Sequence, residues 1–354
     1  MIDYNLLRLR SKFRDFYNKN LVDDYKELEA KRKKYLKIFW FSLFGSILVL
    51  NLLGAFFVVI DFTGGLAGDL FEVLFVVAIA VVGYPIIAFK SQTQETVMSK
   101  IVSFFGDMKY GINRIFDKDI EASELIGHYD EAIIDDSFYG KYKGVDIKVS
   151  EQRLVRKGRK TTITVFRGVF VMLDFDKPFE GKTIVQRKYK YNLFFLIISC
   201  FFALNVICSL FSDFSFIRMC KTLILWGVVG IVFGVVSLNK NNKEEVKLED
   251  VVFSKKWNVY ATDQIEARYL LTTAFMERIL EVKRRFKGMN IEFSFFDNKL
   301  LIAIPSSKDM FETTSLFKPA LKYDRIQNVV YQFYSIFSII DLLKIKGNQK
   351  DESK

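Results

Sequence analysis

The densest cluster of polar side chains that could do chemistry lies between residues 247 and 272. It consists of Glu249, Asp250, Asp263, Glu266 and Arg268. Carboxylates this close together could bind a metal ion or exchange protons with a substrate. The alternative is structural: Asp263 caps a helix, Glu266 is its capping-box partner three residues later, and Arg268 forms an ion pair. We favour the structural interpretation and predict no catalytic residue, metal site or cofactor.

The sequence lacks the residues that the commoner kinds of catalytic site require. His128 is the only histidine, which excludes a His-based triad or a multi-His metal site within one chain. The three cysteines, Cys200, Cys208 and Cys220, do not have the spacing of metal ligands. Neither G-x4-G-K-[ST] nor G-x-G-x-x-G occurs, so no phosphate-binding loop is expected. The sequence leaves enzymatic activity open but favours a non-enzymatic protein.

A second candidate is a basic run between two expected strands. Five positive charges fall within eight residues: Arg153, Arg156, Lys157, Arg159 and Lys160. Such a tip could contact anionic lipid headgroups or an acidic partner, at about 1 kcal/mol for each charge near an anionic bilayer. It could equally be a solvated loop. Both interpretations stay open at this point.

These candidates must be positioned by elements on either side of long apolar segments. Uncharged runs cover residues 38–60, 73–89, 191–212 and 222–239. A hydrocarbon core about 30 Å thick needs roughly 20 helical residues. The runs therefore predict four transmembrane helices in two hairpins, although whether 191–240 spans the membrane fully stays open.

The distribution of charge predicts how these hairpins are oriented. Of the 52 Lys and Arg residues, only Arg218 and Lys221 lie within the four uncharged runs or the loops that join each pair, and the loop 61–72 contains no base. Basic residues are held on the cytoplasmic side of a membrane. We therefore expect both termini and the main polar domain in the cytoplasm. The net charge of +11 mostly reflects this topology, so no nucleic-acid partner is expected.

Alternation and turn residues predict an α+β domain with antiparallel strands. Strands are expected at 144–150, 161–175, 183–188 and 257–261, a helix at 264–286, and a hairpin of 290–296 with 299–305 around Asp297-Asn298. Neither half could bury a sheet face alone. We therefore expect residues 121–190 and 244–320 to form one domain, with the second membrane hairpin inserted between them.

Periodic apolar residues place helices at both ends of the chain. The predicted organisation is an amphipathic cytoplasmic helix at 1–37, the first membrane hairpin at 38–90, a cytoplasmic helix at 91–120, the split domain with its inserted hairpin at 191–240, an amphipathic helix at 321–346 and a disordered tail at 347–354. The helix at 1–37 and the apolar residues 97–115 are expected to pack as an antiparallel pair.

Several motifs resemble the family of the domain of unknown function 3137. They include VYATDQIEARYLLT at 259–272, DFDKPFEGKT at 174–183 and LIAIP at 301–305. The resemblance implies a bacterial inner-membrane protein with an N-terminal membrane hairpin and a cytoplasmic domain, often associated with the LemA family. It supplies no catalytic residues. One departure is the hydrophobic stretch 191–239, where a soluble connection is expected.

These inferences favour a multi-pass membrane protein whose cytoplasmic domain is an interaction or scaffold module at the membrane face. Its expected partners are the lipid bilayer and a membrane or cytoplasmic protein, LemA-like by family association. One alternative is a small transporter or channel component, which usually needs polar groups within the membrane. The other is a membrane-tethered enzyme that uses the cluster from Glu249 to Arg268.

Overall fold

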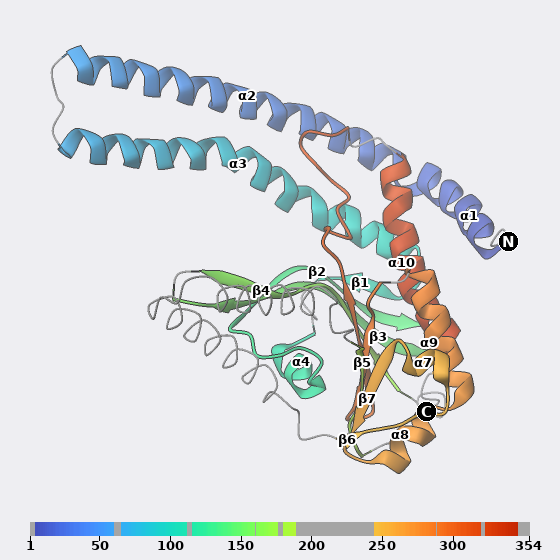
Figure 1. The fold of residues 1–354 in the computed structure, drawn as a ribbon. Helices are drawn as coiled ribbons and strands as arrows, with labels where there is room; N and C mark the ends of the chain where they lie inside the picture. The colour runs from blue at the N-terminus through green and yellow to red at the C-terminus, as the bar shows by residue number, and fades with distance from the viewer. Residues whose placement is uncertain are drawn as a thin grey trace, which may run out of the picture.

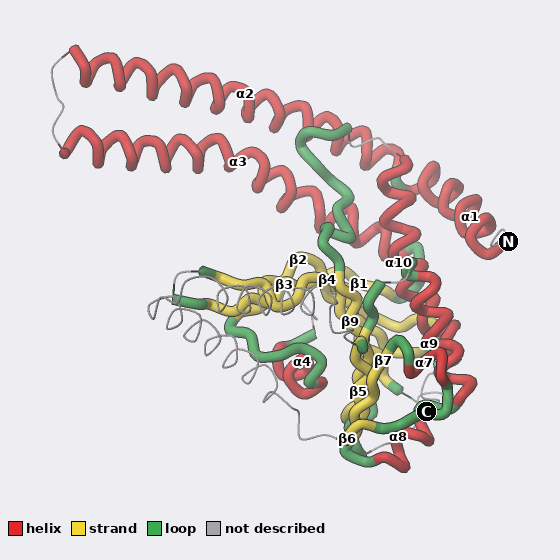
Figure 2. Tube along the Cα trace, viewed as in Figure 1, coloured by secondary structure: helices red, strands yellow, loops and turns green. Residues whose placement is uncertain are grey.

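The computed structural model is an α+β fold from which two long helices project (Figure 1; Figure 2). It describes residues 4–59, 65–111, 115–159, 161–175, 180–188, 244–287, 289–319 and 323–345. The helices are α1 (Tyr4–Asn20), α2 (Val22–Val59), α3 (Gly65–Ser103), α4 (Asp117–Ser123), α7 (Val251–Ser254), α8 (Gln264–Leu270), α9 (Thr273–Arg285) and α10 (Tyr323–Leu343). The strands are β1 (Met108–Tyr110), β2 (Glu131–Tyr142), β3 (Val145–Lys157), β4 (Thr162–Asp174), β5 (Thr183–Arg187), β6 (Glu244–Glu245), β7 (Trp257–Ala261), β8 (Glu292–Phe296) and β9 (Lys299–Pro305).

Helices α2 and α3 run side by side in opposite directions and extend far beyond the sheet (Figure 1). Their outer parts expose large apolar side chains, such as Phe41 at 83% and Ile87 at 71%. In the part of the chain that the structure describes, these two helices are long and apolar enough to cross a membrane. The most apolar 18-residue stretch of each helix is almost entirely exposed, whereas a helix in the core of a soluble protein would be mostly buried.

The inner ends of the same helices belong to the folded core. Tyr25 and Leu28 of α2 are buried in one cluster with Met98 and Ile101 of α3, and Lys100 donates to Asp24 across the pair. The expected antiparallel packing of these segments is present. Helix α2 is uninterrupted from Val22 to Val59. The second part of the helix predicted at 1–37 and the predicted first membrane segment therefore form one continuous helix.

Among the described residues the strands form one antiparallel sheet of nine, in the order β1-β2-β3-β4-β9-β8-β5-β7-β6. β4 pairs with β9, and β5 pairs with both β7 and β8. Strands from before and after residues 189–243 thus share one sheet, as a split domain requires. The described residues confirm the α+β class with antiparallel strands.

The two faces of the sheet bury different sets of side chains. Along β4, Val169, Val171 and Leu173 join the large cluster formed with the helices, whereas Phe170 and Met172 join a smaller cluster on the opposite face. This alternation follows from the two-residue repeat of a strand. Helix α4 covers the smaller cluster through Ile120.

Two predicted helices end differently from what their spacing suggests. The helix expected at 91–120 stops at Ser103, since Gly106 adopts a φ of 102° and residues 108–110 join the sheet as β1. The helix expected at 264–286 is divided into α8 and α9, because the Thr272 hydroxyl accepts from the Phe275 N–H and starts a new helix.

Other predictions agree closely or fall where the structure gives no description. β8 and β9 meet at Asp297 and Asn298 in the hairpin expected there, and the φ values of 48° and 56° at these residues fit a type I′ turn. α10 covers most of the helix expected at 321–346. The second membrane hairpin at 191–240 and the tail at 347–354 lie outside the described residues.

Candidate functional site

A β-bulge in β2 creates the most unusual polar site in the described structure. Ile134 pairs with Gln152 and Ser137 pairs with Ser150, so that Asp135 and Asp136 together lie opposite Glu151 of β3. The extra residue breaks the alternation of faces. As a result Asp136, at 1% exposure, and Glu151, at 4%, are both buried.

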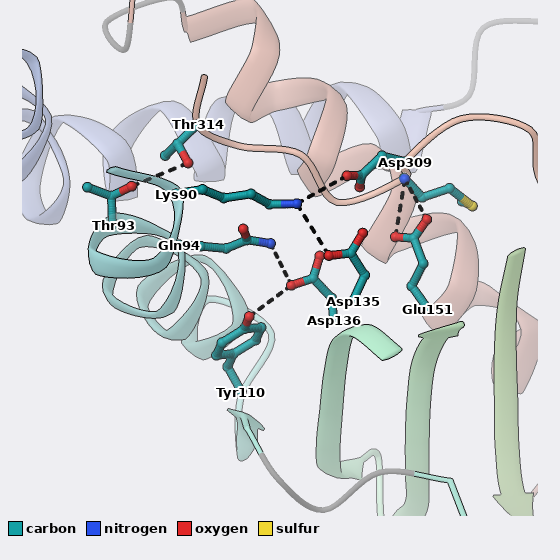
Figure 3. Close-up of polar contacts among 10 residues, drawn as sticks. Lys90, Thr93, Gln94, Tyr110, Asp135, Asp136, Glu151, Asp309 and Thr314 are labelled. Atoms are coloured by element: carbon teal, nitrogen blue, oxygen red, sulfur yellow. Dashed lines mark hydrogen bonds and ion pairs between the residues drawn. The ribbon is translucent and has the colours of Figure 1, made fainter. Parts of the chain in front are cut away.

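Glu151 is held by the segment that follows β9. The backbone N–H of Met310 donates to both carboxylate oxygens of Glu151, at 3.0 and 3.2 Å. Thr314 in the same segment lies 3.4 Å from the Thr93 hydroxyl of α3. The segment 306–314 therefore runs from the sheet to the base of the helical hairpin and covers the bulge on its way (Figure 3).

One oxygen of Asp136 is held from the side of α3 and β1. Its Oδ1 accepts from Gln94 Nε2 at 2.7 Å and from Tyr110 Oη at 2.8 Å. Tyr110 reaches this position because β1 lies close against β2 at Gly140. A Cβ atom there would stand 2.1 Å from the Asp107 carbonyl oxygen, and its φ is 153°.

Lys90 of α3 is the cation that reaches this site from the helical hairpin. Its Nζ lies 3.3 Å from Asp135 Oδ1 and 3.6 Å from Asp309 Oδ2. Figure 3 shows the side chain extending between these two carboxylates. Four carboxyl groups, those of Asp135, Asp136, Glu151 and Asp309, thus gather around one lysine.

Burial raises the pKa values of the inner carboxyls. For Glu151, loss of solvation raises the pKa to about 8, with a smaller contribution from the charges of Asp309, Asp136 and Asp135, against the Met310 hydrogen bond. Loss of solvation likewise raises the pKa of Asp136 to about 6, although Tyr110 and Gln94 oppose it. The pKa of Asp309 rises through burial and through the charge of Asp135. Charge at this site is therefore poorly compensated.

Three of these side chains could share a ligand. One carboxylate oxygen each from Asp136, Glu151 and Asp309 lies within 4.8 Å of the other two. Asp136 Oδ2 and Asp309 Oδ1 are buried and have no hydrogen-bond partner among the described residues. Buried acceptors are normally satisfied. The arrangement can therefore hold a proton or a cation, and it offers no histidine or cysteine.

Three acids of the predicted cluster at 249–268 lie at the N-terminal ends of α7 and α8, and each has a structural role of its own. Asp250 accepts from the N–H groups of Val252 and Phe253 and so caps α7. Asp263 caps α8 in the same way. Glu266 accepts from the N–H groups of Glu180 and Gly181, a tie to the turn before β5 that spacing could not indicate. Glu249 and Arg268 are exposed.

The predicted basic run lies partly within β3 rather than in a loop. Arg153 and Arg156 are in the strand, and Arg156 donates to the His128 carbonyl. Lys157 Nζ lies 2.7 Å from Glu131 Oε2. Arg153 and Arg159 are exposed, and Lys160 lies outside the described residues. In the view of Figure 1 the β3–β4 hairpin extends to the same side as the α2–α3 hairpin.

Sequence reasoning missed the acidic site because its members are far apart. Two local signals were present: consecutive acids interrupt a strand at Asp135-Asp136, and three consecutive polar residues occupy 150–152 of β3. Either one indicates polar groups facing a core. Neither indicates Asp309, which is brought in by the segment after β9.

Comparison with known proteins identifies a family and nothing closer. No curated protein and no solved structure matches the chain. The family model described as "Protein of unknown function (DUF3137)" matches residues 164–345, just over half of the chain. The match begins within β4, extends through α10 and includes Asp309, whereas Asp136 and Glu151 lie before it. The chain therefore belongs to the DUF3137 family of proteins of unknown function.

Proposed function

We propose that this protein is a non-catalytic interaction module anchored in a bacterial inner membrane, with its α+β domain at the cytoplasmic face. The supporting observation is the continuity of α2 and α3, which expose apolar side chains at one end and are buried against the sheet domain at the other. A hairpin of this kind holds the domain at a defined distance and angle from the bilayer.

Charge supports the proposed orientation. The loop between the two helices has no basic residue, whereas Lys31, Lys33, Lys34 and Lys37 stand on α2 before its apolar part and Lys90 follows that of α3. Arg159 lies in the turn between β3 and β4, and Arg153 lies in β3, four residues before its end. In the view of Figure 1 this hairpin extends to the same side as α2 and α3. The two arginines are suited to contact anionic headgroups.

Cysteine labelling tests the orientation. The three natural cysteines are replaced by serine, and a single cysteine is introduced as Gly68→Cys, where a Cβ atom meets nothing within 4 Å. Lys255→Cys, at an exposed position in the α+β domain, is the matched control. An impermeant maleimide applied to intact cells should label only the first variant. Labelling of Lys255→Cys from outside would overturn the proposal.

Crosslinking in native membranes tests the interaction role. A photo-reactive side chain at exposed Arg159 should capture lipid or one stoichiometric protein partner, which family association suggests to be LemA-like. The same probe at exposed Lys287, away from the β3–β4 hairpin, serves as control. Equal, diffuse crosslinking from both positions would contradict a specific contact here.

A further inference from the structure

We propose that Asp136, Glu151 and Asp309 bind one hard divalent cation, such as Ca²⁺, Mg²⁺ or Mn²⁺, at the junction of the helical hairpin and the sheet. The site goes beyond the proposed interaction role and does not depend on it. It would join β2, β3 and the segment 306–314 through a single ion.

The spacing of the oxygens fits a shared ion. One oxygen from each carboxylate lies within 4.8 Å of the other two. Calcium–oxygen distances are about 2.3–2.6 Å, so two ligands on opposite sides of one ion stand up to about 5 Å apart. The three acids therefore need little movement to reach a common centre.

An independent observation is the unsatisfied buried oxygen of Asp136. The residue is 1% exposed, and Gln94 and Tyr110 both donate to its Oδ1, leaving Oδ2 buried with no hydrogen-bond partner among the described residues. Figure 3 shows the second oxygen turned away from these two donors. Asp309 Oδ1 is likewise buried and has no hydrogen-bond partner among the described residues. Buried acceptors without a donor are rare and call for a proton or an ion.

Charge and ligand type specify the kind of ion. Lys90 contacts Asp135 and Asp309 but is not paired with Asp136 or Glu151 in the described contacts. Because the ligands are carboxylates without His or Cys, the site suits hard cations and not Zn²⁺ or Cu²⁺.

Gln94, Tyr110 and Met310 act as the supporting shell. Their donors fix one oxygen of Asp136 and both oxygens of Glu151 before any ion arrives. Supporting hydrogen bonds of this kind orient ligands and tune affinity in metal sites. The bulge supplies the geometry that a regular strand would not, since it turns Asp136 inward beside Ser137.

Direct binding is measured on the full chain, purified in detergent and freed of metal with EDTA. Isothermal titration with Ca²⁺ and Mg²⁺ and electron paramagnetic resonance with Mn²⁺ should each show whether one ion binds per chain. Saturable binding of one of these ions, with a rise in unfolding temperature, is expected. No saturable binding up to about 10 mM, weaker than the weakest calcium modules, would overturn the proposal and leave a protonated acid cluster.

Variants assign the binding to this site. Asp136→Asn and Glu151→Gln should each weaken binding at least about tenfold, as changes around metal sites do. The matched control is Asp146→Asn, because Asp146 is exposed on the same strand as Glu151 and should leave affinity unchanged. Wild-type affinity in the first two variants would place the ion elsewhere and refute the assignment.

If those variants do not fold, terbium luminescence of the wild-type chain and of a Tyr110→Phe variant, which keeps all three acids, tests the site. Tb³⁺ in place of Ca²⁺ emits when a nearby tyrosine is excited, and Tyr110 directly contacts Asp136. Ca²⁺ should abolish this emission by competition, and Tyr110→Phe should reduce it by more than half. Unchanged emission with Tyr110→Phe would show that Tb³⁺ binds away from Asp136.

Discussion

At the scale of single residues, Glu292 of β8 makes stability depend on pH. Burial raises its pKa, and the N–H and charge of Arg187 offset this only in part. The native state therefore keeps the proton of Glu292 to a higher pH than the unfolded chain does. Its contribution to stability is present below the ordinary pKa of glutamate and is lost as pH rises through the raised value.

Glu292→Gln should accordingly lose less stability than the wild type as pH rises from about 4 to 8. The measurement is thermal unfolding in detergent across that range. The difference between the two proteins isolates Glu292, because Asp136, Glu151 and Asp309 are present in both. Parallel curves for the two proteins would show that Glu292 does not titrate in this range.

A second prediction at the residue scale concerns Asp250 and Asp263, which cap the N-terminal ends of α7 and α8. Asp250→Ala and Asp263→Ala each remove an acceptor for two backbone N–H groups and should cost about 1 kcal/mol of unfolding free energy. Glu249→Ala, at an exposed position beside Asp250, is the control and should be near neutral. Denaturant unfolding checks all three. A neutral Asp250→Ala would mean that the cap carries no stability.

How much could be predicted from the sequence differs between these two groups of acids. Asp250 and Asp263 lie two and three residues from the N–H groups that they cap, so local spacing suffices to identify Asp263 as a cap. Asp136, Glu151 and Asp309 meet only through a bulge and a segment after β9. The periodicity of apolar residues predicts neither the bulge nor the path of that segment, because a bulge interrupts the two-residue repeat of a strand.

At the scale of elements, the position of β1 depends on a glycine in its neighbour. Gly140→Ala would place a Cβ atom 2.1 Å from the Asp107 carbonyl oxygen, at a φ that disfavours other residues. We expect β1 to separate from β2 and Tyr110 to leave Asp136, at a cost of about 1–3 kcal/mol. Gly127→Ala is the control, since its nearest atom would be 4.0 Å away.

Hydrogen exchange should locate the effect of Gly140→Ala. Amides of 107–111 are expected to lose protection, while those of β7 and β8 keep it. Denaturant unfolding gives the total loss. Full protection of β1 in this variant would show that the backbone adjusts to the added methyl group without losing the strand.

The same scale shows which elements the sequence predicted well. The β8–β9 hairpin was predicted because its turn residues and alternation agree, and β5 and β7 lie within a residue of their expected bounds. β2 was not predicted, since Asp135-Asp136 interrupts its pattern. β1 was assigned to a helix because its apolar residues continue a helical spacing, and only the sheet edge beside it favours a strand.

At the scale of the whole molecule, Arg32 joins the α2–α3 hairpin to the segment after β9. Its guanidinium pairs with Glu29 and donates to the Leu316 carbonyl, with only 10% of its side chain exposed. Arg32→Met would leave buried Glu29 without this partner and should cost about 3 kcal/mol. Lys31→Met is the control, because Lys31 forms an exposed pair with Glu27 and such pairs contribute little.

Hydrogen exchange across 306–319 measures whether this connection holds the segment. Arg32→Met should speed exchange there, and Lys31→Met should not. Slow exchange in both variants would mean that the ring contact between Phe39 and Phe317, with centroids 5.0 Å apart, fixes the segment without Arg32.

The pairing of distant strands has a consequence for how the chain is made. Leu173 of β4 lies beside Leu300 of β9, and both neighbours of β5 are translated after it. At 5–20 residues per second the ribosome needs about 6–25 seconds between those two leucines. During that time α2 and α3 are already complete, while β4 and β5 expose open edges that attract other chains. We therefore expect nascent chains to pass through an aggregation-prone stage in which α2 and α3 are complete and the sheet is not.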